Sequence, residues 1–285
     1  MEYSFVRYLE SKRSVDDRAL NRGVWQALRT QLDQSRSDTP MRVMEVGGGI
    51  GTMLQRFLEQ GVFDQAHYTL LDQDKKNIEE AELRTANAFP EMSLDFVNED
   101  VFDYFEKNPG HKWDLVIAHA FLDLVNIAEF LSQLVGQLAD QALCYFTINY
   151  DGVTIFEPEI DAELDSKILR LYHQSMDTRQ KGDRLPGGSW AGRHLFLNLQ
   201  RAGLHILEAG SSDWVVFPRQ GKYLSDEAYF LHHILHFIEG SLSEHPEMDN
   251  SIFTNWLARR HEQVESGELI YIAHQLDFLA TRRFA

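Results

Sequence analysis

The chain has 285 residues, of which 44% are hydrophobic and 12% aromatic, enough apolar material for a substantial core. Asp and Glu outnumber Lys and Arg by 44 to 27, which gives a net charge of -17. Such a surface repels the phosphate backbone of nucleic acids unless a basic patch overrides it. The densest basic spots are only the pairs Lys75-Lys76 and Arg259-Arg260, so we expect no nucleic-acid partner.

The sequence also argues against membrane insertion, export and disulfide bonding. No apolar stretch reaches the roughly 18 to 20 residues needed to cross a bilayer. Residues 1–5 lack both the basic and the apolar region of a signal peptide. The single cysteine, Cys144, excludes an internal disulfide framework and a Cys-rich zinc site. We therefore expect a cytoplasmic protein with no membrane partner.

The predicted elements begin with helices over residues 1–38, whose apolar stripe should pack on the domain that follows. From Met41, short apolar runs alternate with amphipathic helical segments, a pattern typical of βαβ units in a parallel sheet. One helical stripe covers 122–139. Strands are predicted at 42–46, 67–71, 93–97, 113–118 and 142–149.

After Asn149 this alternation breaks. A helix is predicted at 161–178, with Asp161 as its N-cap, followed by a cluster of helix breakers at 185–188. The α/β pattern then resumes. The remaining predicted elements are a helix at 191–202, a strand at 205–217, two helices within 223–265 that end at Gly240 and Gly267, and a last strand at 269–279.

The most informative stretch is 41–54, where a β-run and an acid lead into a glycine cluster and a helix. Glycines at this point allow a tight turn and close backbone approach, and the helix N-terminus offers free N–H groups to a nucleotide-like ligand. The dinucleotide fingerprint G-x-G-x-x-G fails here. Its third glycine is replaced by Thr52 if the pattern starts at Gly47 and by Leu54 if it starts at Gly49.

The spacing Glu45-x-Gly47-x-Gly49-x-Gly51 instead resembles motif I of class I S-adenosylmethionine-dependent methyltransferases. The resemblance covers about residues 41–150 and 191–217 and returns at 269–279. It implies an α/β fold with a Rossmann-like, seven-stranded, mostly parallel sheet and an antiparallel last strand, plus helical cap insertions. It also implies S-adenosylmethionine as the cofactor.

The same resemblance implies roles for the residues that follow each strand. Asp72 would accept hydrogen bonds from the ribose hydroxyls, and Asp100 would contact the adenine, although Glu99 could take that role. His119 would lie where the fourth strand opens towards the methyl group. The implied cofactor-binding residues are Glu45, Gly47, Gly49, Gly51, Asp72, Asp100, Val101 and His119.

The pattern changes divide the chain into core and cap segments. The core comprises 39–151 and 191–218, joined by a last strand at 268–285, and residues 1–38 pack on it. Residues 152–190 and 219–267 are expected to form the helical cap. The bland alternative is that these helices thicken the core or form the interface of a homodimer.

The implied reaction is in-line transfer of the methyl group to a small-molecule acceptor, whose reacting atom could be O, N or C. An O–H or N–H acceptor needs a base within hydrogen-bond reach, whereas a carbon nucleophile might need none. The predicted catalytic residues are His119, Asp123 and Tyr150, with Asp151 and His173 as further candidates. Asp123 could equally be the N-terminal carboxylate of the following helix.

Alternatives to this function remain open at the sequence level. The chain could bind the cofactor without methylating anything, as a sensor or scaffold, because glycine loop and acids touch only the nucleoside. A nicotinamide oxidoreductase is disfavoured by the failed third glycine. His232 and His236 are spaced to share a helix face, but no third ligand is evident, so no metal site is expected.

Overall fold

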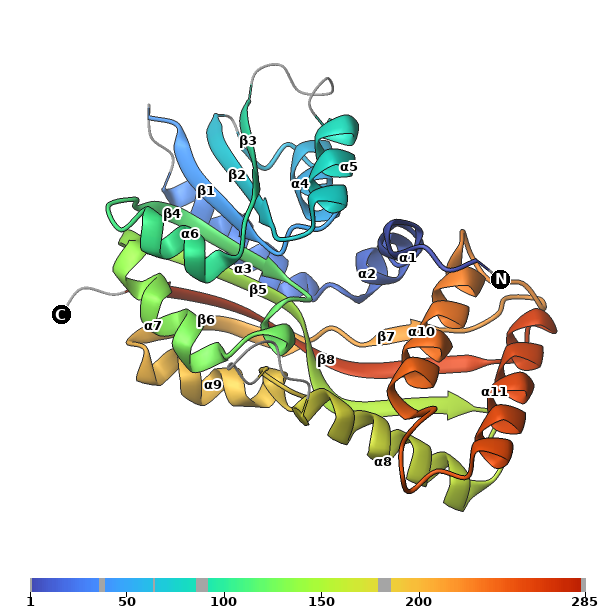
Figure 1. The fold of residues 1–285 in the computed structure, drawn as a ribbon. Helices are drawn as coiled ribbons and strands as arrows, with labels where there is room; N and C mark the ends of the chain where they lie inside the picture. The colour runs from blue at the N-terminus through green and yellow to red at the C-terminus, as the bar shows by residue number, and fades with distance from the viewer. Residues whose placement is uncertain (1, 36–38, 64, 86–91, 179–185, 283–285) are drawn as a thin grey trace.

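A mixed sheet forms the centre of the computed structural model, which describes residues 2–35, 39–63, 65–85, 92–178 and 186–282 (Figure 1). The strand order is β3-β2-β1-β4-β5-β8-β6, and β7 pairs with β8 in addition. Strands β3 to β5 run parallel, while β8 is antiparallel to both β5 and β6. The predicted fold class is therefore confirmed. The strands are β1 (Met41–Val46), β2 (Ala66–Asp72), β3 (Ser93–Asn98), β4 (Trp113–His119), β5 (Leu138–Glu157), β6 (Leu204–Ser211), β7 (Trp214–Val216) and β8 (Ile270–Arg282).

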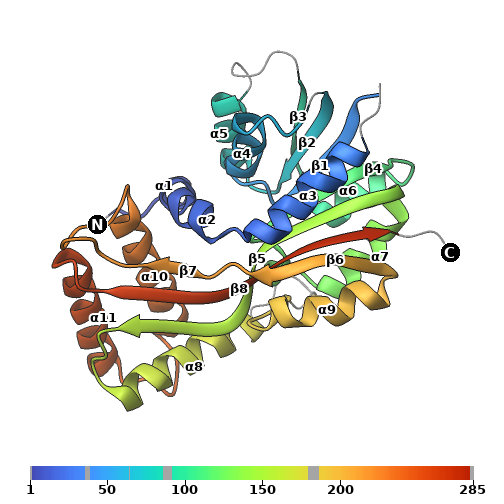
Figure 2. The same ribbon diagram turned by 180° about the vertical axis from the view of Figure 1, so that it is seen from behind.

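Helices cover both faces of the parallel part of the sheet (Figure 2). Alternate residues of a strand point to opposite faces, so Val43 packs with one helical layer while Met44 packs with the other. The first layer contains α3 (Arg22–Gln34), α4 (Thr52–Glu59) and α5 (Lys75–Thr85). The second contains α6 (Val101–Lys107), α7 (Ile127–Gln137) and α9 (Ala191–Arg201). No described helix is long and apolar enough to cross a membrane.

Strands β5 and β8 are longer than the others and leave the core together (Figure 1). Beyond the core they pair with each other and with β7, and three helices pack on them: α8 (Ala162–Thr178), α10 (Glu227–Leu242) and α11 (Asn250–Glu265). We call this second unit the cap. The N-terminal helices α1 (Phe5–Ser11) and α2 (Arg13–Ala19) contribute Tyr8 and Val15 to its apolar cluster.

The predicted end of a strand at Asn149 is wrong, because β5 continues to Glu157. The pair Asp151-Gly152 looks like a turn in the sequence, but Gly152 has φ +74 and lies where the register with β8 shifts. After this bulge, Thr154 and Phe156 are buried and the residues between them are exposed. The start of the expected helical segment 152–190 is therefore sheet.

Other boundaries also move for local reasons. The predicted helix at 122–139 begins only at Ile127, because Asn126 caps α7 by accepting from the N–H of Glu129 at 3.0 Å. The predicted strand at 205–217 is two strands, and Gly240 lies inside α10 rather than at its end. Asp161 does cap α8, accepting from the N–H of Leu164 at 2.9 Å. Predictions that fall on 36–38 and 179–185 lie outside the described residues.

Asp277 of β8 sits where core and cap join and holds two backbone donors. Its carboxylate accepts from the N–H of Ile148 at 2.7 Å and of Asn21 at 2.8 Å, while the side chain is fully buried. Ile148 has φ +57, which a β-branched residue rarely adopts, so this bond stabilises a strained position in β5.

We predict that Asp277→Ala lowers the free energy of unfolding by about 2 to 4 kcal/mol, because two buried N–H groups lose their acceptor. Asp277→Asn should cost less, since its carbonyl oxygen can still accept one of the two bonds. Urea unfolding of both variants and the parent measures this. Equal losses in the two variants would contradict the role given to the carboxylate.

Candidate functional site

The glycine loop joins β1 to α4 and is shaped for close approach of a ligand. Gly49 has φ +55, a conformation that residues with a Cβ rarely adopt. A Cβ at Gly47 would lie 2.2 Å from Cδ2 of Phe121, so this loop and the segment after β4 face each other without room for a side chain. Backbone bonds from Gly48 to Leu71 and from Gly51 to Gly48 close the turn.

Asp72 ends β2 beside this loop, as predicted from the sequence. Its Oδ2 accepts from the N–H of Gly49 at 2.9 Å, and its Oδ1 accepts from the N–H of Asp74 at 2.8 Å and from Asn77 Nδ2 at 3.3 Å. Burial raises the pKa of this carboxyl, although these hydrogen bonds oppose the effect. The carboxylate is only half-buried, so it can accept further hydrogen bonds from a ligand between the loop and β2.

Glu45 lies underneath the loop. Its side chain is 1% exposed, and Oε2 accepts from the hydroxyl of Tyr68 at 2.5 Å. It also accepts from the N–H of Leu54 in the first turn of α4. Burial raises the pKa of Glu45 to about 7. In this arrangement Glu45 fixes β1, β2 and α4 around the loop.

The residues after β3 are brought to the same edge of the sheet. Asp100 caps α6 by accepting from the N–H of Phe102 at 2.9 Å, and Val101 is buried in the first turn. The neighbouring Glu99 is bound to Lys107, and its N–H donates to the carbonyl of Asp72 at 3.1 Å. The ends of β2 and β3 are thereby held together next to the glycine loop.

His119 ends β4 and is buried in a network that crosses three parts of the molecule. Its Nδ1 is 2.8 Å from Thr147 Oγ1 on β5, and its Nε2 is 2.9 Å from Asp16 Oδ2 on α2. The fully buried Asp16 also accepts from Lys12 Nζ at 2.7 Å and from Trp214 Nε1 at 2.8 Å. Both ring nitrogens of His119 therefore have protein partners.

Protonation of this pair follows from burial and charge. Desolvation lowers the pKa of His119 to about 4, although the Asp16 carboxylate beside it favours the charged ring. The pKa of Asp16 is lowered by Lys12, His119 and Arg56, which together outweigh the effect of its burial. A neutral ring must then donate from Nε2 to Asp16 and accept at Nδ1 from the hydroxyl of Thr147.

Tyr150, on the part of β5 that leaves the core, belongs to a second polar group. Its hydroxyl is 2.7 Å from His173 Nε2 on α8 and 2.7 Å from Thr154 Oγ1. Burial lowers the pKa of His173, which keeps this imidazole neutral at neutral pH, and it raises the pKa of Tyr150. The group joins strand and cap helix at the carboxyl edge of β5.

Electrostatic coupling shows that these two groups surround a common space. Burial raises the pKa of Tyr8 on α1, and Asp16, Tyr172 and Asp123 raise it further. Asp123 and Tyr172 have the same effect on Tyr150. Asp123 lies in the 3₁₀ turn Leu122–Leu124 rather than capping α7. The structure thus brings all three predicted catalytic residues to one edge of the sheet.

Two other predicted candidates are held elsewhere. Asp151 forms a two-oxygen ion pair with Arg193, with Nη2 to Oδ2 at 2.9 Å and Nε to Oδ1 at 2.9 Å. His232 pairs with His261, their Nδ1 atoms lying 2.7 Å apart. In the part of the chain that the structure describes, no three His, Cys, Asp or Glu residues are grouped as they would be around a metal ion.

Comparison with known proteins places this site in a family. Residues 44–144, which include the glycine loop, Asp72, Asp100 and His119, match the family described as a methyltransferase domain. This segment is a class I methyltransferase domain. Its cofactor is S-adenosylmethionine. A search of the curated proteins finds no match to the chain.

Solved structures give only distant likenesses. A SAM-dependent methyltransferase from Thiobacillus denitrificans, in complex with S-adenosyl-L-homocysteine, is 13% identical, with a TM-score of 0.49 and coverage of 99% of this chain and 100% of that one. The cyclopropane synthase MmaA2 from Mycobacterium tuberculosis is 11% identical, with a TM-score of 0.49 and coverage of 90% and 83%. Likenesses this distant do not carry a substrate from one protein to another.

The residues of the methyltransferase domain fit S-adenosylmethionine. The side-chain-free surface of the glycine loop would accommodate close approach of the nucleoside, and the carboxylate of Asp72 suits a pair of ribose hydroxyls. Asp100 and the backbone of Val101 at the neighbouring strand end would face the base. These assignments remain predictions for individual residues.

Several residues of the site had no clear signal in the sequence. Lys12 and Asp16 are spaced i, i+4, which predicts an ion pair on one helix face, but not its burial against β4. Tyr8, Tyr172 and Thr154 come from three distant segments. They meet only because the N-terminal helices and α8 pack at the same edge of the sheet.

We predict that Asp72→Ala weakens binding of S-adenosylmethionine by about 1.5 to 3 kcal/mol, roughly 10- to 150-fold, because charge-assisted bonds to the ribose are lost. Isothermal titration calorimetry measures the dissociation constant. Asp140→Ala, at an exposed position near the opposite end of β5, serves as the matched control. An unchanged affinity in folded Asp72→Ala would place the ribose elsewhere.

A second prediction concerns pH. Because the pKa of His119 is lowered from 6.5 to about 4, its contribution to stability is complete above pH 6.5 and is lost as the pH falls towards 4. His119→Gln can donate and accept at similar places but cannot be protonated. We expect the parent to lose about 2 to 3 kcal/mol more than this variant over that range, measured by urea unfolding. Parallel pH profiles would refute the assignment.

Proposed function

We propose that the protein transfers a methyl group from S-adenosylmethionine to a small-molecule acceptor held between the core and the cap. The observation that carries this proposal is the convergence of polar side chains from both units. Tyr150 and Asp123 come from the core edge, His173 and Tyr172 from α8, and Tyr8 from α1. We call this group the acceptor cluster.

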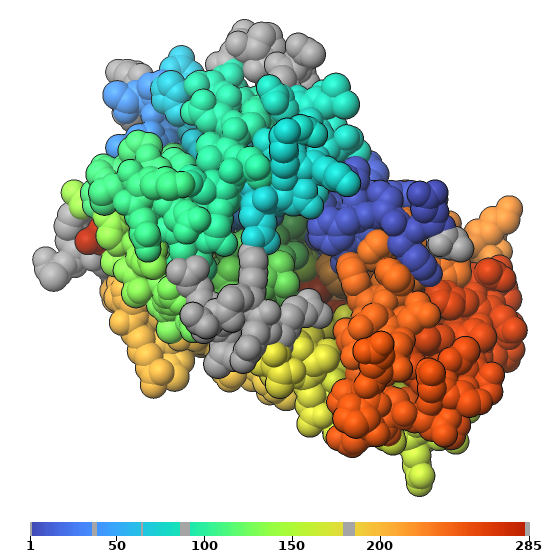
Figure 3. Space-filling view, viewed as in Figure 1, coloured from blue at the N-terminus to red at the C-terminus, as the bar shows by residue number. Residues whose placement is uncertain are grey.

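The shape of the molecule agrees with a site of this size. Figure 3 shows a hollow between the cyan and green core and the blue and orange elements α1 and α10, with deeper green and red atoms visible inside. Ligand sites in open α/β sheets lie at the carboxyl ends of the strands, where β4 and β5 carry His119 and Tyr150. Helices of the cap cover this edge and would exclude water from the reacting atoms.

S-adenosylmethionine supplies an electrophilic methyl group when bound, so the protein's tasks are to align the acceptor and manage its proton. His119 has both nitrogens bound and is assigned to positioning the edge of the site. Tyr150 is the better candidate for proton transfer. As the new bond to the methyl carbon forms, its phenol oxygen can take the acceptor's proton while its own proton passes to His173 Nε2, 2.7 Å away.

A small acceptor also suits the charge of the chain. A net charge of -17 disfavours nucleic acid, as argued above. The cluster mixes tyrosine rings with a few polar groups, which is the usual composition of a small-ligand site.

The decisive experiment follows the methyl group. The protein is incubated with methyl-labelled S-adenosylmethionine and a cell extract divided into small-molecule, protein and nucleic-acid fractions. We expect label in the small-molecule fraction and not in the macromolecules. Tyr150→Phe should lower the rate of labelling, while its affinity for the cofactor, measured by calorimetry, stays unchanged.

The control variant is Gly49→Val, because a branched side chain is strained at φ +55 and meets Leu9. It should lose both cofactor binding and labelling. Label in protein or nucleic acid would refute the small-molecule acceptor. Tight cofactor binding with no labelling in any fraction would instead favour a sensor or scaffold.

A further inference from the structure

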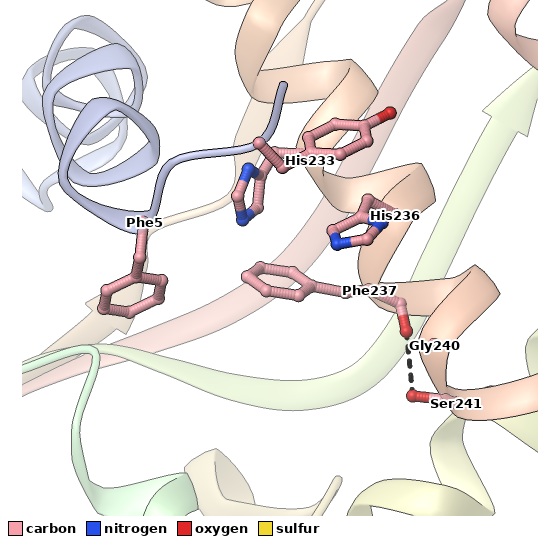
Figure 4. A pocket seen from close by; sticks show the side chains of 7 residues that line it. Phe5, His233, His236, Phe237, Gly240 and Ser241 are labelled. Atoms are coloured by element: carbon pink, nitrogen blue, oxygen red, sulfur yellow. Dashed lines mark hydrogen bonds between the residues drawn. The ribbon is translucent and has the colours of Figure 1, made fainter. Parts of the chain in front are cut away.

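A second hollow, outside the acceptor cluster, lies between the N-terminal segment and α10 (Figure 4). Its volume is about 510 Å³, within the range of small-ligand sites. None of its lining residues belongs to the methyltransferase domain or to the acceptor cluster. We call it the aromatic pocket, and it is lined by Tyr3, Phe5, His233, His236, Phe237, Gly240 and Ser241.

The rings of this pocket are arranged at right angles to one another. Tyr3 stacks on His236, with centroids 4.0 Å apart and planes 5° apart. The ring of His233 is perpendicular to Tyr3, at 5.4 Å and 83°, and to Phe237, at 4.6 Å and 79°. Perpendicular walls present the negative faces of some rings to one enclosed space, which is the arrangement that attracts a rounded cation.

Charge around the pocket favours the same kind of ligand. Burial lowers the pKa of His233 to about 4, so its ring is neutral at pH 7 and does not repel a cation. The carboxylate of Glu239 lies 3.4 Å from His236 Nδ1 at the rim. Nδ1 of His233, a side chain that is 4% exposed, has no hydrogen-bond partner among the described residues.

A neighbouring contact shows that this surface already accepts a cation. The guanidinium of Arg7 lies 3.9 Å above the ring of Tyr229, which in turn packs against Tyr3 at 6.4 Å. Arg7 is held there by Asp226, with Nε to Oδ2 at 2.8 Å. It is thus engaged beside the aromatic pocket rather than inside it.

We propose that the aromatic pocket binds an organic cation with a methylated ammonium centre. Such a cation is weakly hydrated and large enough to touch several rings at once, whereas an ordinary ammonium would lose strong hydrogen bonds to water. The polar wall is largely satisfied, since the hydroxyl of Ser241 donates to the carbonyl of Phe237 at 2.8 Å, drawn as a dashed line in Figure 4.

The pocket lies one ring away from the acceptor cluster. Tyr8 stacks on His233 at 4.6 Å, and its hydroxyl end is coupled to Asp16 and Asp123. The proposed binding nevertheless does not depend on methyl transfer, so it can be tested whether or not the proposed function holds.

The test compares two probes of the same shape. Choline carries a trimethylammonium group, and 3,3-dimethylbutan-1-ol is its neutral isostere. By calorimetry on the full chain at neutral pH, we expect choline to bind about tenfold more tightly than the isostere, because only the cation gains from the ring faces. Saturating S-adenosylhomocysteine should leave choline binding unchanged.

Variants locate the site. Tyr3→Leu and Phe237→Leu should each weaken choline binding at least about fivefold, while Tyr3→Phe, which keeps the ring, should bind like the parent. Phe196→Leu, which removes a 42% exposed ring from α9, is the matched control, and thermal unfolding confirms that each variant is folded. Equal affinity for both probes, no choline binding, displacement by S-adenosylhomocysteine or an equal effect of Phe196→Leu would overturn the proposal.

Discussion

The buried carboxylate of Asp16 is the interaction on which the arrangement of the site depends. It joins the N-terminal helices to β4 through His119, to the cap through Trp214, and to its own helix through Lys12. A charge with no exposed surface is tolerated only when such partners surround it, and removing one partner leaves the others unpaired. The edge of the sheet where the reaction is proposed is thereby closed by a side chain from the first 20 residues.

Backbone strain is concentrated at the same edge. Ala120 has φ +50 and Ile148 has φ +57, and they directly follow the paired residues His119 and Thr147. The N–H of Ala120 donates to the carbonyl of Thr147 at 2.9 Å, and Asp277 holds the N–H of Ile148. Strained positions persist where surrounding bonds over-determine them, and such positions cluster at active sites. This observation independently supports the carboxyl ends of β4 and β5 as the place of chemistry.

The sequence predicted the parts of the fold that depend on local patterns. The strands from Met41 to His119 were predicted to within a few residues because each is a short apolar run ended by glycine or an acid. The passage of β5 through Gly152 was missed, because a bulge and a turn have the same local composition. The contact between Asp16 and His119 joins residues 103 positions apart, and no local pattern encodes it.

The continuity of β5 and β8 explains how a cap added to a methyltransferase domain can take part in its chemistry. Both strands run from the core sheet into the cap sheet, so their register places the cap relative to the glycine loop without a flexible linker between them. Tyr150 lies on this continuous strand and binds His173 of α8. Methyl transfer depends strongly on the alignment of the acceptor, and side chains on rigid elements hold geometry better than side chains on loops. A sheet shared by two units is therefore a physical means of aligning an acceptor with a cofactor bound on the other.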